Sequence, residues 1–138
     1  MTAGLTSSRV AAACASVALI VALGACGSSK PAYCGDLTSL QDSIKGLKNL
    51  DTSTGVVSGL QSQLTKIQSD ASALVSSAKS DFPNETTAIK SSVDALSVTV
   101  KALPSSPSAT DIATLTRQGG SVVTAVNSFT DATSSKCG

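Results

Sequence analysis

Histidine and tryptophan are absent from this 138-residue chain, and glutamate occurs once, as Glu85. Histidine is the commonest general base and a frequent metal ligand, so its absence removes the usual acid–base, triad and zinc chemistries. Helical bundles that hold two metal ions also need several glutamates and Glu-x-x-His pairs. We therefore expect no enzymatic activity, no catalytic residues, no cofactor and no metal site.

A serine–lysine arrangement is the one catalytic alternative that the composition leaves open. Ser76 and Ser77 lie close in sequence to Lys79, and Ser91 follows Lys90. A chain so rich in serine produces such neighbours by chance, so the expectation of a non-enzymatic protein stands.

An excess of charge of one sign is also missing. The chain has ten basic and nine acidic side chains, and of the basic ones only Arg9 precedes Cys26. Proteins that bind nucleic acids or anionic membranes by electrostatics need clustered lysine and arginine. We expect no nucleic-acid partner and no electrostatic membrane binding. All aspartates are expected to serve as helix caps or as solvated surface.

The first 25 residues have the pattern of an export signal. Arg9 and the amino terminus form a short positive segment, and residues 10–23 are all aliphatic or small. This apolar segment suits a signal peptide and is shorter than the roughly 20 residues that a membrane-spanning helix needs.

The apolar segment ends in Leu23, Gly24, Ala25 and Cys26, which resembles the lipobox of bacterial lipoproteins. The resemblance implies cleavage before Cys26, a diacylglycerol thioether on its thiol, and an amino group that can be acylated, for example with palmitate. It implies a protein held by this lipid on the outer face of the bacterial cytoplasmic membrane. The alternatives are an ordinary signal cleaved after Ala25, which leaves Cys26 a free thiol, and an uncleaved anchor.

The chain accordingly divides into three parts: a cleaved signal peptide (1–25), a lipidated Gly/Ser/Pro tether (26–33) and one domain (34–138). Its alanine-rich and hydroxyl-rich composition resembles that of small secreted lipoproteins of actinobacteria. A cysteine ahead of the first helix and another at the carboxyl end belong to the same resemblance. That group implies no single activity.

Apolar residues after Tyr33 recur at alternating steps of three and four, which is the spacing of amphipathic helices. The spacing predicts helices over about 36–50 and 54–80, a third that ends near Leu103, and a fourth that follows Ser108. The expected caps are Asp36, Asn84 and Ser108, the last in a capping box with Asp111. Core positions of the fourth helix are Ile112, Leu115, Gly119, Val122, Val126 and Phe129.

Short turns between these segments predict an all-α, antiparallel, up-down four-helix bundle. Gly119 and Gly120 weaken the fourth helix, because glycine costs about 1 kcal/mol relative to alanine. They are either a hinge or close helix crossing, or a weak point that the bundle tolerates.

Cys34 precedes the first predicted helix and Cys137 follows the last one. An even number of antiparallel helices brings both chain ends to the same end of the bundle, so we expect a disulfide between them. A redox-active pair and a metal site are the alternatives. The same topology gathers Tyr33, Phe82 and Phe129 near the disulfide on the membrane side. We expect a packed plug at the end of the core, and a lipid or partner contact is the alternative.

These observations favour a membrane-anchored, non-enzymatic interaction or structural module with an envelope protein as its partner. Its distal turns, 51–55 and 104–109, would face that partner. The alternative is a carrier or sensor that binds a small hydrophobic ligand between the helices. Small core residues such as Ala71 and Gly119 leave room for a cavity or allow close helix packing, so an apolar pocket of a few hundred cubic ångströms would favour the carrier.

Overall fold

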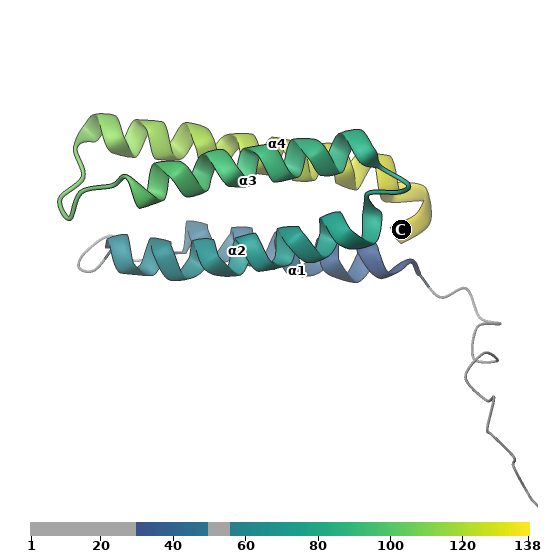
Figure 1. Cartoon of the computed structure of the whole chain (residues 1–138). Helices are drawn as coiled ribbons and strands as arrows, with labels where there is room; N and C mark the ends of the chain where they lie inside the picture. The colour runs from purple at the N-terminus through teal and green to yellow at the C-terminus, as the bar shows by residue number, and fades with distance from the viewer. Residues whose placement is uncertain (1–29, 50–55) are drawn as a thin grey trace, which may run out of the picture.

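A computed structural model describes residues 30–49 and 56–138, and four α-helices account for most of them. They are α1 (Ala32–Lys48), α2 (Val56–Ala78), α3 (Pro83–Lys101) and α4 (Ala109–Cys137). Successive helices run in opposite directions, and α1 begins at the end of the bundle where α4 finishes (Figure 1). The predicted all-α four-helix bundle is confirmed. The lipobox residues Leu23, Gly24, Ala25 and Cys26 lie outside the described residues.

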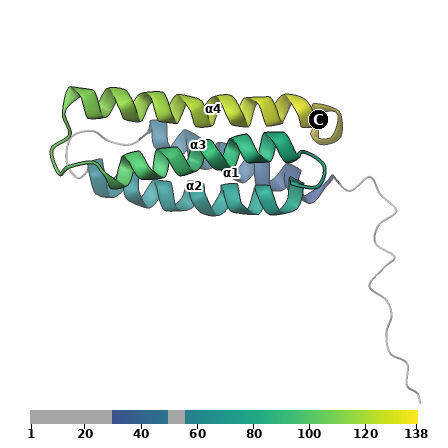
Figure 2. The same cartoon turned by 45° about the horizontal axis from the view of Figure 1, so that its top comes forward.

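The core consists of aliphatic side chains at the predicted helical spacing. Leu40, Ile67, Leu74, Ile89 and Leu96 are among its most completely buried members. In the order α1, α2, α3, α4, each helix packs along the next, whereas contact between α4 and α1 is sparse. Figure 2 shows this order of the helices from a second direction. The bundle is therefore well packed on three of its four seams and sparsely packed along the fourth.

Two of the predicted caps are wrong. The first helix begins at Ala32, and its N-cap residue is Pro31, whose carbonyl accepts a hydrogen bond from the Cys34 amide. Asp36 thus lies in the second turn of α1. The third helix begins at Pro83, with Phe82 as its N-cap residue. Proline suits the first helical position because that amide would have no intrahelical partner.

The predicted capping box at the start of α4 is confirmed. The Asp111 amide donates to the Ser108 hydroxyl over 3.2 Å, and the Ser108 amide donates to the Asp111 carboxylate over 2.8 Å. The two hydrogen bonds from Ser108 hold the pKa of Asp111 below its ordinary value, against a smaller opposing effect of desolvation. The helix then continues through Gly119 and Gly120 as far as Cys137 without a break.

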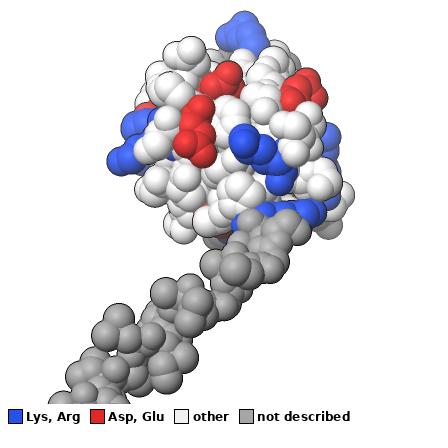
Figure 3. All heavy atoms as spheres, turned by 90° about the vertical axis from the view of Figure 1, so that its right-hand side faces the viewer, with Lys and Arg blue, Asp and Glu red and all other residues white. Residues whose placement is uncertain are grey.

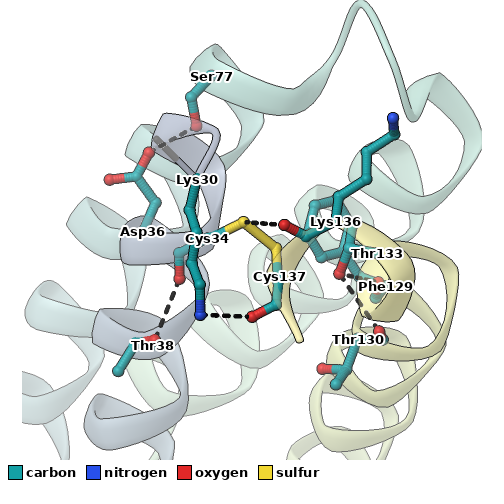
Figure 4. Close-up of a disulfide and its surroundings, with 10 residues drawn as sticks. All are labelled: Lys30, Cys34, Asp36, Thr38, Ser77, Phe129, Thr130, Thr133, Lys136 and Cys137. Carbon is teal, nitrogen blue, oxygen red and sulfur yellow. Dashed lines mark hydrogen bonds between the residues drawn. A yellow bond between two sulfur atoms is a disulfide. The ribbon is translucent and has the colours of Figure 1, made fainter. Parts of the chain in front are cut away.

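The predicted disulfide closes the end of the bundle where α1 begins. Cys34 and Cys137 are bonded, with their Cα atoms 5.5 Å apart. Both lie within helices, Cys34 in the first turn of α1 and Cys137 as the last residue of α4, rather than outside the helices as the spacing suggested. Beside the disulfide, the Lys30 ammonium donates to the Cys137 carbonyl (Figure 4).

The three aromatic residues form the predicted cluster at this end. The ring centroids of Phe82 and Phe129 are 5.4 Å apart, and Tyr33 lies edge-on to both. This contact is well within a helix diameter of about 10 Å, so the packed plug is confirmed. Burial, and to a lesser degree the charge of Asp81, raises the pKa of Tyr33.

Candidate functional site

Two of the residues considered for catalysis from the sequence contact acidic side chains. The Ser77 hydroxyl donates to the Asp36 carboxylate, and the Lys90 ammonium pairs with Asp94. Within residues 30–49 and 56–138, no group of three or more histidine, cysteine or acidic side chains is placed to hold a metal ion. In the same two ranges, no helix is both long enough and apolar enough to span a membrane.

Two aspartates differ from their predicted roles, which were helix cap for Asp36 and helix cap or solvated surface for Asp70. Asp36 and Asp70 are half-buried between α1 and α2, and each accepts a hydrogen bond from a serine of the other helix. The pairs are Asp36 with Ser77 and Asp70 with Ser43. Residues 36 and 43 are seven apart on α1, and residues 70 and 77 are seven apart on α2. A serine–aspartate hydrogen bond therefore occurs twice along the seam, two helical turns apart, with the aspartate on α1 in one pair and on α2 in the other. The interface between α1 and α2 is therefore partly polar.

The neighbouring seam, between α1 and α4, contains an apolar cleft in the half of the bundle away from the disulfide. Its volume is about 550 Å³, within the range of small-ligand sites. The lining comes from all four helices and is mostly aliphatic: Ile44, Leu47, Lys48, Val56, Leu60, Ile67, Leu96, Ile112, Leu115, Thr116, Gly119, Gly120, Val122 and Val123.

The cleft deepens from an exposed rim to a buried floor. Ile67 and Leu96 form the floor and belong to the fully buried core. Ile112, on the first turns of α4, is 43% exposed at the rim. The prediction that Ile112 is a core residue is thus wrong, and Leu115 and Gly119 are only half-buried.

The composition of α4 explains why the core stops short here. Val122, Val126 and Phe129 fill the core at the expected spacing, but the preceding position of that series is Gly119. A Cβ atom added to Gly119 or Gly120 would meet no described atom within 4 Å. The structure therefore gives no support to a close helix crossing at these glycines. The missing side chain contributes directly to the space of the cleft.

Among the described residues that line the cleft, Lys48 is the one with a charged side chain. It is exposed and has no hydrogen-bond or ion-pair partner in the described part of the chain. The other polar side chain of the lining is Thr116, whose hydroxyl already donates to the Ile112 carbonyl. Among the described residues, Lys48 is thus the single charge at the mouth of the cleft.

Nearer the disulfide, α1 and α4 are joined by polar contacts. The Gln41 amide donates to the Thr130 hydroxyl over 3.1 Å, and the disulfide follows beyond it. A shallower and more polar hollow of about 690 Å³ lies over these contacts. The seam is therefore tied at the disulfide end and open at the distal end.

The sequence offered a cavity at small core residues such as Gly119 as an alternative to close helix packing. It did not predict the exposed rim of the cleft, because the periodicity assigned Ile112 and Leu115 to a continuous core. The comparisons add no family to this description, because no protein-family model, curated protein or solved structure matches the chain.

Proposed function

We propose that this protein is a lipid-anchored, extracytoplasmic binding protein without enzymatic activity, and that its ligand is a small hydrophobic molecule held in the distal cleft. The observation that carries the proposal is the cleft itself: about 550 Å³, lined almost entirely by aliphatic side chains, with a preformed floor at Ile67 and Leu96. Sites of this size and lining are typical of small-ligand binding.

The position of the cleft agrees with an anchor on Cys26. The bundle begins at Ala32, and Ile44 in the cleft lies twelve residues further along α1. At 1.5 Å per helical residue this distance is roughly 18 Å. A lipid on Cys26 would leave the cleft in the half of the bundle farther from the point of attachment.

The surface at the disulfide end supports attachment by lipid rather than by charge. Figure 3 shows basic and acidic side chains interspersed on this end of the bundle, without a patch of one sign. Exposed charges of mixed sign attract an anionic membrane weakly at physiological salt. Two or three acyl chains would supply the durable attachment.

The anchor is tested by metabolic labelling of the full chain with a radioactive fatty acid, followed by membrane fractionation. We expect label on the wild-type chain and none on the Cys26→Ser variant. Equal labelling of the two chains, or a wild-type chain without label, would refute the anchor.

The cleft is tested in the same membranes with a neutral, diazirine-bearing long-chain alcohol and peptide mapping of the photoproducts. We expect labelled peptides that contain Leu60, Leu115 or Val122, and loss of this labelling in the Gly119→Leu variant. The matched control is Gly35→Leu, because Gly35 is also helical, has open space around an added Cβ and lies at the disulfide end. Equal labelling of these peptides in the wild type and in the Gly119→Leu variant would refute the cleft as the ligand site.

A second candidate function is the docking of an envelope protein at the same end. The exposed Ile112 side chain favours it because it continues the apolar lining of the cleft onto the surface, and contiguous apolar patches mark contact sites. A photoreactive residue at position 112 should then yield one crosslinked partner protein, and Gly119→Leu should leave that crosslink intact if only the rim is used.

A further inference from the structure

We propose that the ligand of the cleft is a single-chain amphiphile with an anionic head group, whose head lies at Lys48 and whose chain lies on Ile67 and Leu96. This inference rests on the proposed function of the cleft and adds the chemical class of its ligand. It follows from the gradient of polarity between floor and rim, from the charge at the mouth and from the volume.

The gradient separates two environments along the depth of the cleft. Ile67 and Leu96 are at most 1% exposed, so the floor offers only apolar contacts. Lys48 and Thr116 are exposed, so the rim is in contact with water. A molecule that is apolar at one end and polar at the other satisfies both environments, whereas a polar group on the floor would lose its hydrogen bonds.

The charge at the mouth selects the sign of the head group. On the same helix, Lys45 is paired with Asp42 over 3.1 Å, while Lys48 has no carboxylate partner in the described ranges. Since no acidic side chain occurs in the part of the lining that the structure describes, an anionic head gains an ion pair at the rim. A cationic head would meet a like charge.

The volume of the cleft suits a ligand with one alkyl chain. About 550 Å³ lies in the middle of the range for single small ligands, which is about 300 to 1,000 Å³. Gly119 supplies part of this space, because its backbone borders the cleft without a side chain. A single alkyl chain can therefore reach the floor beside α4.

The test uses the full chain in membranes, labelled by the neutral photoreactive alcohol, with unlabelled ten-carbon competitors that carry a carboxylate, a hydroxyl or an ammonium head. Lys48→Gln is the test variant. Lys66→Gln is the matched control, because Lys66 is also exposed and helical but does not line the cleft. Comparison between variants cancels the different partitioning of the competitors into the membrane.

We expect the carboxylate to compete best in the wild type, with an advantage over the alcohol of up to about fivefold. Lys48→Gln should remove this advantage and Lys48→Glu should reverse it, while Lys66→Gln should leave it unchanged. Each methylene added to the competitor should strengthen competition about fourfold until the cleft is filled.

Three results would overturn the inference, and they are distinguishable. Equal competition by all three head groups, with labelling still lost in Gly119→Leu, would refute the anionic ligand and leave the hydrophobic site in place. Absence of labelling at the cleft with every probe would refute the site as well. Competition by a two-chain phospholipid as strong as that by the single-chain carboxylate would refute the single-chain class.

Discussion

Removal of the disulfide by the double substitution Cys34→Ser and Cys137→Ser should destabilise the bundle strongly. The bond joins residues 103 positions apart, so it closes almost the entire described domain into one loop. For a loop of about 100 residues, the loss of chain entropy in the unfolded state corresponds to about 4.7 kcal/mol. A domain of this size is usually stable by only about 5–15 kcal/mol, so a third or more of its stability is at stake.

Because of the position of the disulfide, its removal should lower the stability of the adjacent helix ends as well as that of the whole bundle. Contact between α1 and α4 is sparse, and the disulfide with the Gln41–Thr130 hydrogen bond ties their seam near the chain ends. Without the bond, we expect faster amide hydrogen exchange in the first turn of α1 and the last turn of α4. Exchange in the middle of α2 and α3 should follow the global stability.

Urea unfolding monitored by far-ultraviolet circular dichroism measures the effect. At an m-value of about 1.5 kcal/mol per molar urea, the midpoint should fall by about 3 M. Reduction of the wild-type chain should reproduce this shift, and reduction of the double variant should change nothing. A loss below about 1 kcal/mol would show that the unfolded chain is compact without the bond and would refute the entropy argument.

Three further predictions concern other parts of the bundle. Gly119→Ala should stabilise the protein by about 1 kcal/mol and raise the melting temperature by about 4–8 °C, because alanine favours the helix and its Cβ meets open space; Gly35→Ala is the control for the helix effect alone. Phe129→Ala should cost about 3–5 kcal/mol in urea unfolding, since the ring is fully buried in the aromatic cluster. Asp111→Asn should lower the melting temperature near neutral pH and match the wild type in strong acid: the lowered pKa gives stability above the ordinary value of 3.8 that is lost as the pH falls through the folded-state pKa.

The helices and their core faces could be predicted from the sequence because burial repeats with the helical period. From Leu60 to Ala78 the predicted apolar series coincides with the buried face of α2. The topology then placed Cys34 and Cys137 together, since an even number of antiparallel helices returns the chain to its starting end. The disulfide and the aromatic cluster could be predicted from this topology, and the capping box from the residue types at the start of α4.

Helix starts and polar contacts were harder to predict. Asp36 has the residue type of an N-cap, but Tyr33 and Cys34 gain burial by continuing the helix back to Ala32. Asp70 has the residue type of a surface position, but its hydrogen bond comes from Ser43 on a different helix. A single sequence contains no direct signal for such a contact, because the partner is set by the packing of two helices.

The cleft lowers the stability of the bundle, whereas the disulfide end raises it. At the disulfide end, the bond and the aromatic cluster both add stability, whereas Gly119 gives up helix propensity and core packing at one position. Alanine at that position would be more stable and would take up part of the space. Gly119 thus lowers the stability of the fold while it enlarges an apolar site. This combination is expected where a binding site is kept at the expense of stability. Under the proposed function, Gly119→Ala should therefore raise the melting temperature and weaken ligand binding together.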